Sequence, residues 1–108
     1  MFEILKTKKF EREFKQLYKK FPSLKDDLFS LLYEIEQNPY LGTPLGRDCY
    51  KIRLPISSKG KGKAGGARLI THVYVQNKTV YLLSLYDKSE ISSLSDKEIL
   101  KLIKDKDL

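Results

Sequence analysis

Two amphipathic helix patterns that follow one another almost without a gap constrain the fold of this chain more than any other feature. In the first, which Thr7 can cap, apolar side chains recur at helical spacing and end before Pro22: Phe10, Phe14, Leu17, Tyr18 and Phe21. The second, which Ser23 is expected to cap, stops at Asn38-Pro39, and its apolar positions are Leu24, Leu28, Leu31, Leu32 and Ile35. Because so few residues join the two, we predict an antiparallel helical hairpin.

Strand patterns precede and follow this hairpin. An apolar run at the N-terminus predicts a short first strand at Phe2–Leu5. Three longer strands are expected further along the chain, at Cys49–Ile56, Ala67–Val75 and Val80–Tyr86. The tripeptide Gln76-Asn77-Lys78 is a tight turn that should join the last two strands in an antiparallel hairpin. The final strand is apolar on both faces and is expected inside the sheet, whereas Pro55 places its own strand nearer an edge.

The remaining segments complete an α+β fold. Residues 39–48 are rich in glycine and proline and predict a connecting loop, and Ser95-Asp96-Lys97-Glu98 is a capping box that opens a last short helix. The predicted order is β-α-α-β-β-β-α, with the helical hairpin packed on a mainly antiparallel four-stranded sheet. At this length we expect a single domain spanning residues 1–108.

Cysteine usage and hydropathy indicate the expected environment. Cys49 is the only cysteine, which excludes an internal disulfide and a thiolate metal cluster, and we expect no metal site and no cofactor. The N-terminus lacks the features of a signal peptide, and no segment approaches the roughly 18 apolar residues of a membrane span. We therefore expect a cytoplasmic protein with no membrane partner.

The region from Lys51 to Arg68 is strongly basic. It contains six cationic side chains, four glycines and no acidic residue, in a chain whose net charge is +7. Such a charge favours nucleic acid, an anionic membrane or an acidic protein as a partner. Three of the six cations fall on a glycine-rich segment that we expect to be a flexible loop: Lys59, Lys61 and Lys63. This segment lacks the spacing of a phosphate-binding P-loop.

The alternation of side chains along the strands predicts a cationic cluster. A period of two turns Lys51 and Arg53 to the same face, about 7 Å apart, opposite the apolar side of their strand. If the next strand presents the same face, Arg68 lies near this pair, and Lys88 can approach from the loop after the last strand. Four converging cations would bind a phosphodiester. For Lys51 and Arg53 taken alone, a strand face that is simply exposed to solvent explains the charged side chains equally well.

Such a cluster could also cleave RNA through attack by the neighbouring 2′-hydroxyl. This reaction needs a base, positive charge on the phosphorane and an acid for the leaving 5′-oxygen. A lysine crowded by other cations can act as the base because its pKa falls, whereas arginine supplies fixed charge. His72 is a natural acid or base at neutral pH, but its mid-strand position equally suits packing. Cys49 is expected to be a small core residue and not a nucleophile.

The chain resembles the RelE/ParE superfamily of bacterial toxins from type II toxin–antitoxin systems. The resemblance runs nearly end to end, and three segments carry it beside the hairpin: Cys49-Tyr50-Lys51-Ile52-Arg53-Leu54, Ala67-Arg68-Leu69-Ile70 and Leu83-Ser84-Leu85-Tyr86-Asp87-Lys88-Ser89-Glu90. It implies a metal-independent messenger RNA endoribonuclease, an mRNA interferase that is ribosome-dependent. The catalytic residues that it implies are Lys51, Arg53, Arg68 and Lys88.

The chain also departs from RelE in ways that bear on RNA recognition. RelE ends with a tyrosine that stacks on a message base, whereas residues 91–108 here contain no aromatic residue, which leaves Tyr86 or Tyr74 as the substitute. The longer glycine-rich loop is expected to add phosphate contacts, which makes the implied RNA-binding set Lys59, Lys61, Lys63, His72, Tyr74 and Tyr86.

The resemblance also implies partners. These are a cognate antitoxin protein, messenger RNA and the ribosome, with promoter DNA bound only through the toxin–antitoxin complex. Two alternatives stay open: a ParE-like toxin that binds DNA gyrase and has no nuclease activity, and a catalytically inactive module that binds nucleic acid or the antitoxin.

Overall fold

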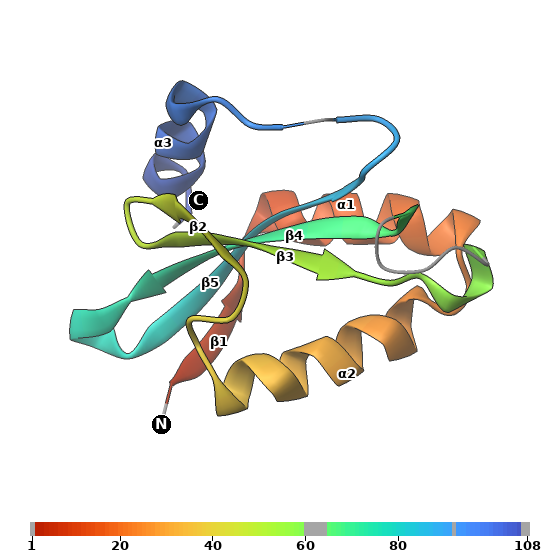
Figure 1. Ribbon diagram of the computed structural model, residues 1–108, viewed down its shortest axis with the longest axis horizontal. Coiled ribbons are helices and arrows are strands. Elements are labelled where there is room, and N and C mark those ends of the chain that lie inside the picture. Colours follow the sequence, from red (N-terminus) through yellow and green to blue (C-terminus); the bar gives the residue numbers. More distant parts are fainter. Residues whose placement is uncertain (1, 60–64, 92, 107–108) are drawn as a thin grey trace.

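Five strands and three α-helices form the part of the chain that the computed structural model describes, residues 2–59, 65–91 and 93–106 (Figure 1). The strands are β1 (Glu3–Lys6), β2 (Thr43–Gly46), β3 (Cys49–Leu54), β4 (Ala67–Tyr74) and β5 (Thr79–Asp87). The helices are α1 (Lys8–Lys20), α2 (Leu24–Gln37) and α3 (Asp96–Lys104), and two 3₁₀ turns are η1 (Ser57–Lys59) and η3 (Val75–Asn77).

The strands form one mixed sheet in the order β1-β5-β4-β3-β2. Strand β1 runs parallel to β5, and the other three pairings are antiparallel. The α+β class, the helical hairpin and the mainly antiparallel sheet are therefore confirmed. The last strand lies inside the sheet, as its apolar residues predict, and every residue of β5 is buried.

The predicted number of four strands is wrong. The additional strand, β2, lies within the segment 39–48 that the sequence predicts to be a loop, and it forms the sheet edge beside β3. Pro44 has no amide hydrogen to give to the ladder, but an edge strand tolerates proline because one side remains unpaired. Gly42 precedes this strand at a φ of 107°, and a Cβ there would lie 2.6 Å from the Lys51 carbonyl oxygen. The close approach of β2 to β3 therefore requires glycine.

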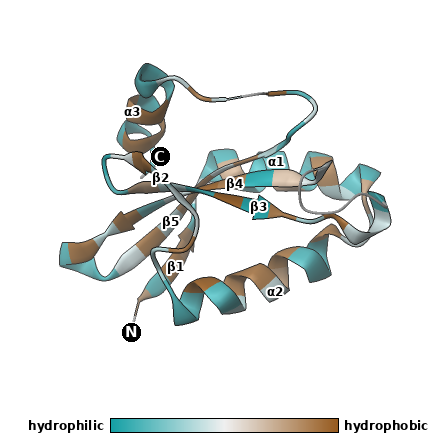
Figure 2. Ribbon diagram, in the orientation of Figure 1, coloured by the Kyte–Doolittle hydropathy of each residue, from teal (hydrophilic) through white to brown (hydrophobic). Residues whose placement is uncertain are grey.

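Capping interactions explain where the helices begin. The Thr7 hydroxyl accepts a hydrogen bond from the Phe10 amide, and Ser95 with Glu98 forms a complete capping box, so both predicted caps are confirmed. The third predicted cap is wrong, because Ser23 occupies the N-cap position of α2 but its hydroxyl donates to the Asp27 carboxylate and does not cap the helix. Figure 2 shows helices α2 and α3 banded brown and teal, as expected when one side packs inward.

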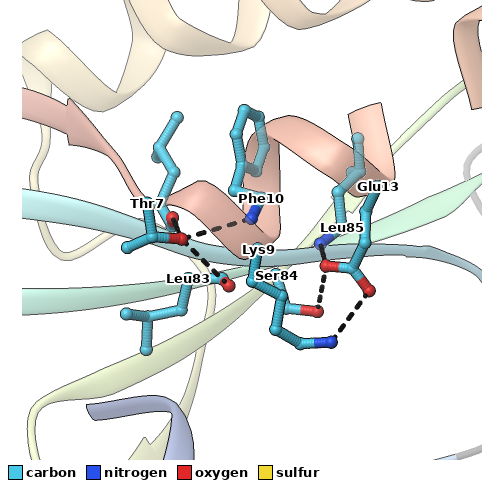
Figure 3. A network of polar contacts seen from close by, with 8 residues as sticks. Thr7, Lys9, Phe10, Glu13, Leu83, Ser84 and Leu85 are labelled. Carbon is cyan, nitrogen blue, oxygen red and sulfur yellow. Dashed lines mark hydrogen bonds and ion pairs between the residues drawn. The ribbon is translucent and has the colours of Figure 1, made fainter. Parts of the chain in front are cut away.

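Helix α1 continues along the edge of β5 that β1 leaves open. Strand β1 pairs with β5 only as far as Leu82, where Thr7 donates both its amide and its hydroxyl to the Leu82 carbonyl. Nearly two turns further along α1, Glu13 accepts hydrogen bonds from the Ser84 hydroxyl at 2.9 Å and the Leu85 amide at 3.1 Å (Figure 3). The carboxylate therefore satisfies a strand amide that has no neighbouring strand on this side.

Two apolar clusters hold the layers together. The larger one joins α1 and α2 to one face of the sheet, through residues such as Phe10, Leu28, Leu54 and Leu82. The smaller one joins α3 to the other face, and its buried members are Cys49, Ile70, Tyr81, Leu83, Tyr86 and Ile99. Figure 1 accordingly shows α3 and α2 on opposite sides of the strands. Within the described ranges, no helix has the length and apolar character needed to cross a membrane.

Candidate functional site

The strand register brings the basic residues of β3 and β4 together. Arg53 lies opposite Arg68, and Arg68 lies opposite Tyr86 on β5. Directly opposed residues project from the same face of a sheet, so these three form a continuous Arg53–Arg68–Tyr86 row. Its face is the one that carries α3, because Tyr86 belongs to the α3 cluster. The expected proximity of Arg68 to Arg53 is therefore present.

Two lysines flank the Arg53–Arg68–Tyr86 row. Lys51 lies two residues before Arg53 on the same face of β3, opposite Ile70, and is half-buried. Lys88 follows β5, is exposed, and donates its amide to the Gly66 carbonyl at the start of β4. A Cβ on Gly66 would lie 2.2 Å from the Leu54 carbonyl oxygen, so only glycine lets these strand ends approach closely.

The inner part of the row is shielded from solvent. Arg68 and Tyr86 are each only 5% exposed, whereas Arg53 is exposed. The Arg68 guanidinium donates to the Ala67 carbonyl oxygen at 3.1 Å. A phosphate that approaches the exposed Arg53 can thus reach Arg68 only after the side chains that cover Arg68 move aside.

The Tyr86 hydroxyl is a buried group with no hydrogen-bond partner. Burial raises the pKa of Tyr86; the positive charge of Arg68 acts against this shift, and the negative charge of Glu98 on α3 adds to it. The phenol therefore keeps its proton at neutral pH. Its hydroxyl is a hydrogen-bond donor near Arg68 and has no acceptor in the folded protein.

Lys59 does not ride a flexible loop, so this part of the sequence prediction is wrong. It lies in η1, and its ammonium contacts both carboxylate oxygens of Asp87 at 2.8 and 2.9 Å and lies over the ring of Phe21. Burial acts against ionisation of Asp87, but hydrogen bonds from Lys59 and Ser89 lower its pKa. Lys59 is thus neutralised by an internal carboxylate. Lys61 and Lys63 lie outside the described residues.

His72 and Tyr74 lie at the other end of β4. Counting along the strand, they are about 13 and 20 Å from Arg68, so the structure does not bring them to the Arg53–Arg68–Tyr86 row. The His72 ring packs beside the rings of Tyr74 and Tyr81, and Lys106 lies over both tyrosines. Burial, with a contribution from the Lys106 charge, lowers the pKa of His72. This geometry favours the packing role for His72.

Cys49 is confirmed as a core residue. It is buried, and its Sγ lies 3.5 Å from Nδ1 of His72. Burial raises the pKa of the Cys49 thiol to about 11, so the nucleophilic thiolate is scarce at neutral pH. Among residues 2–59, 65–91 and 93–106, no three His, Cys, Asp or Glu side chains are grouped closely enough to hold a metal ion.

Two acidic residues near the row were missed by sequence reasoning. Asp87 pairs with Lys59 across 28 positions of sequence, and Glu98 acts electrostatically on Tyr86 from α3. The capping box marks Glu98 only as a helix-start residue. The one sequence feature that could have identified Asp87 as a residue near the site is its position between Tyr86 and Lys88, at the end of a strand that is apolar on both faces.

Together, the fold and the Arg53–Arg68–Tyr86 row define a small basic α+β protein whose sheet carries two arginines and a tyrosine side by side on one face. The model of the family described as the RelE toxin of the RelE/RelB toxin–antitoxin system matches residues 2–105, and the chain belongs to this family.

Solved structures agree with this assignment at the level of the fold. The isolated E. coli RelE toxin is 21% identical, with a TM-score of 0.63, and the match covers 95% of this chain and 99% of that one. The intact E. coli RelBE toxin–antitoxin complex gives 21% identity and a TM-score of 0.62 over 81% of this chain and 96% of that one. An E. coli RelE mutant in complex with a peptide of the antitoxin RelB gives 17% identity and a TM-score of 0.62, and the match covers 93% of this chain and 92% of that one.

Proposed function

We propose that this chain is the toxin of a type II toxin–antitoxin system and acts as a metal-independent endoribonuclease on messenger RNA in the cytoplasm. The observation that carries the proposal is the Arg53–Arg68–Tyr86 row, in which three adjacent strands supply two guanidinium groups and a phenol to one face. Membership of the RelE toxin family supports the same function.

The proposed reaction needs no group beyond these side chains and the RNA. The 2′-oxygen attacks the adjacent phosphorus, the bond from phosphorus to the 5′-oxygen breaks, and the products are a 2′,3′-cyclic phosphate and a 5′-hydroxyl. Lys51 accepts the proton of the 2′-hydroxyl, and Lys88 donates a proton to the leaving 5′-oxygen. Arg53 and Arg68 stabilise the charge of the phosphorane by fixed positive charge and bidentate hydrogen bonds.

Purified variants test the assignment of roles. Loss of a general base or of a charge-stabilising group typically reduces rates by about 10²- to 10⁴-fold, so Lys51→Ala and Arg68→Ala should cleave RNA at least about 100-fold more slowly than the parent. Because Arg68 is buried, Arg53→Ala provides an exposed variant of the same row with less effect on folding. Lys78→Ala, in the turn before β5, is the matched control and should cleave at the parental rate. Equal rates in all four folded variants would show that the row is not catalytic.

Partners follow from the same proposal. The toxin acts on messages in the ribosome and is silenced by a cognate antitoxin, and the toxin–antitoxin complex binds promoter DNA through the antitoxin. Primer extension on cellular messages after induction should show breaks within codons. Intact messages together with relaxed or linearised DNA would instead indicate a ParE-like toxin that acts on gyrase.

A further inference from the structure

The turn that follows β5 is tied down by the side chain of Asp87, the last residue of that strand. Asp87 is 6% exposed, and its Oδ1 accepts hydrogen bonds from the amide and the hydroxyl of Ser89, at 3.0 and 2.9 Å. Its backbone carbonyl oxygen accepts the Glu90 amide at 3.0 Å. An aspartate side chain that accepts the amide two residues further on forms an Asx turn. Lys88 is therefore the middle residue of a turn whose backbone is fixed.

The same carboxylate is held from another direction by Lys59. The Lys59 ammonium contacts both carboxylate oxygens of Asp87, at 2.8 and 2.9 Å, and lies 5.3 Å from the centre of the Phe21 ring. Lys59 belongs to η1, which is itself anchored to α2, because Asp27 accepts both the amide and the hydroxyl of Ser57. The position of Asp87 is thus fixed by contacts that extend back to the helical hairpin.

The turn places Lys88 next to the Arg53–Arg68–Tyr86 row. Lys88 follows Tyr86 by two residues along the chain. Its amide donates at 3.2 Å to the carbonyl oxygen of Gly66, which precedes Arg68 by two residues. The backbone of Lys88 is therefore attached to both strands that carry the buried part of the row. Because a lysine side chain is long and flexible, the conformation of this backbone decides which positions the ammonium can reach.

Stability alone is a weak explanation for the buried ion pair of Lys59 and Asp87. The two side chains are 16% and 8% exposed, so both charges lose most of their hydration. Replacement of such a pair by apolar residues of similar volume is often neutral or stabilising. Asp87 also accepts two hydrogen bonds from Ser89, which the ion pair does not require. A need for the geometry of the turn explains both sets of contacts.

We propose that Asp87 is a positioning residue for Lys88 and fixes the turn that aims the Lys88 ammonium at the leaving 5′-oxygen. The proposal rests on the proposed function, in which Lys88 protonates that oxygen. In this role Asp87 does not contact the RNA and acts through the conformation of residues 87–89. Without the turn, the ammonium is no longer held within reach of the oxygen, and loss of a positioned general acid costs about 10²- to 10⁴-fold in rate.

RNA in which a bridging sulfur replaces the leaving 5′-oxygen separates proton donation from other effects. When the phosphorus–sulfur bond breaks, the sulfur keeps the electron pair and leaves as a thiolate, which needs no proton donor because the pKa of a thiol is only about 8.5. Single-turnover rates of the full chain are measured on both substrates, in a short message bound to purified ribosomes. The sulfur is placed at the bond that the parent cleaves.

Asp87→Ala should slow cleavage of the oxygen substrate about 100-fold, as Lys88→Ala should, and both variants should cleave the sulfur substrate within about threefold of the parental rate. The double variant Asp87→Ala and Lys88→Ala should be no slower than Lys88→Ala alone, because both changes remove the same contribution. Glu90→Ala removes an exposed carboxylate from the same turn. It is the matched control and should cleave both substrates at the parental rate.

Two further variants keep the test decisive if Asp87→Ala does not fold, since that change leaves the Lys59 ammonium buried without a partner. Lys59→Met with Asp87→Ala leaves no unpaired charge and should show the same selective loss on the oxygen substrate. Lys59→Met with Asp87→Asn also leaves no unpaired charge, but it keeps an oxygen that accepts the Ser89 amide. This conservative variant should recover about tenfold of the loss.

Equal losses on the two substrates in the Asp87 variants would overturn the proposal, because Asp87 would then support only the overall structure. A selective loss of the same size in Glu90→Ala would also overturn it, since the charge of the turn would explain the result. Failure of the proposed function looks different. A parent that cleaves neither substrate, or a Lys88→Ala variant that is equally slow on both, would refute the nuclease or the proton donor, and the positioning role with it.

Discussion

The buried hydroxyl of Tyr86 shows how a single group in the Arg53–Arg68–Tyr86 row can favour function at the expense of stability. An unpaired buried polar group costs about 1–3 kcal/mol, and the Tyr86 hydroxyl has no partner. A well-packed core would normally place phenylalanine at such a position. Retention of the hydroxyl near Arg68 is explained if RNA supplies the missing acceptor when it binds.

Replacement of Tyr86 by phenylalanine should therefore separate stability from activity. We expect Tyr86→Phe to raise the free energy of unfolding by about 1 kcal/mol, measured by urea denaturation, because the unpaired hydroxyl is removed. RNA cleavage by the same variant should fall about tenfold, which is the value of one hydrogen bond of roughly 1.4 kcal/mol to the reacting RNA. Tyr33→Phe, at an exposed position on α2, should change neither quantity. A Tyr86→Phe variant that is less stable and fully active would contradict this account.

At the scale of elements, the junction of α1 with β5 is held by one carboxylate. Glu13 occupies the position that a neighbouring strand would take, and it receives the Leu85 amide, the Ser84 hydroxyl and the Lys9 ammonium. This contact fixes α1 against the strand that carries Tyr86. The placement of α1 relative to the Arg53–Arg68–Tyr86 row thus depends on Glu13.

Removal of this carboxylate should weaken the junction. We expect Glu13→Ala to lower the free energy of unfolding by about 1–3 kcal/mol, because the Leu85 amide is left buried without an acceptor. Glu13→Gln keeps an acceptor oxygen and should lose less than Glu13→Ala. Hydrogen exchange should report faster exchange at Leu85 in the alanine variant. Glu11→Ala, at an exposed position on the same helix, is the control, and an equal loss there would refute the specific role of Glu13.

The elements that sequence reasoning predicted well are those whose signal is local. The spacing of apolar residues in α1 and the capping box at Ser95 are each complete within a few positions, and both are present in the structure. Strand β2 was missed because its residues Thr43–Gly46 resemble a loop, and only pairing with β3 makes them a strand. Side-chain parity also indicated that Arg68 could lie near Arg53. The ion pair of Lys59 with Asp87 has no periodic signal, since it depends on how η1 folds back onto the end of β5.

At the scale of the whole molecule, the titratable groups whose pKa the fold lowers couple folding to pH in two separate ranges. Burial and the charge of Lys106 lower the pKa of His72 in the folded protein below its usual 6.5. Hydrogen bonds from Ser57 and Ser23 outweigh burial to lower the pKa of Asp27, and those from Lys59 and Ser89 do the same for Asp87. In each case the unfolded chain takes up the proton at a higher pH than the folded one. Stability must therefore fall as pH falls through these groups.

Urea midpoints measured from pH 8 to pH 3 should accordingly show two declines. One begins near pH 6.5, and the second begins near pH 4.5 and continues below pH 3.8, the usual pKa values of Glu98 and of the two aspartates. His72→Phe keeps an aromatic ring between Tyr74 and Tyr81 but cannot titrate, so it should abolish the upper decline and leave the lower one intact. The double variant Asp27→Asn and Asp87→Asn should make the lower decline shallower and keep the upper one, at a reduced stability throughout because the Lys59 ion pair is lost. The part that remains belongs to Glu98, whose pKa is lowered by its hydrogen bonds with Ser95. Each variant is thus the control for the other. A single decline that neither variant alters would mean that acid unfolds the protein by general charge repulsion and not through these groups. The chain already has a net charge of +7 at neutral pH, and this charge grows as the pH falls.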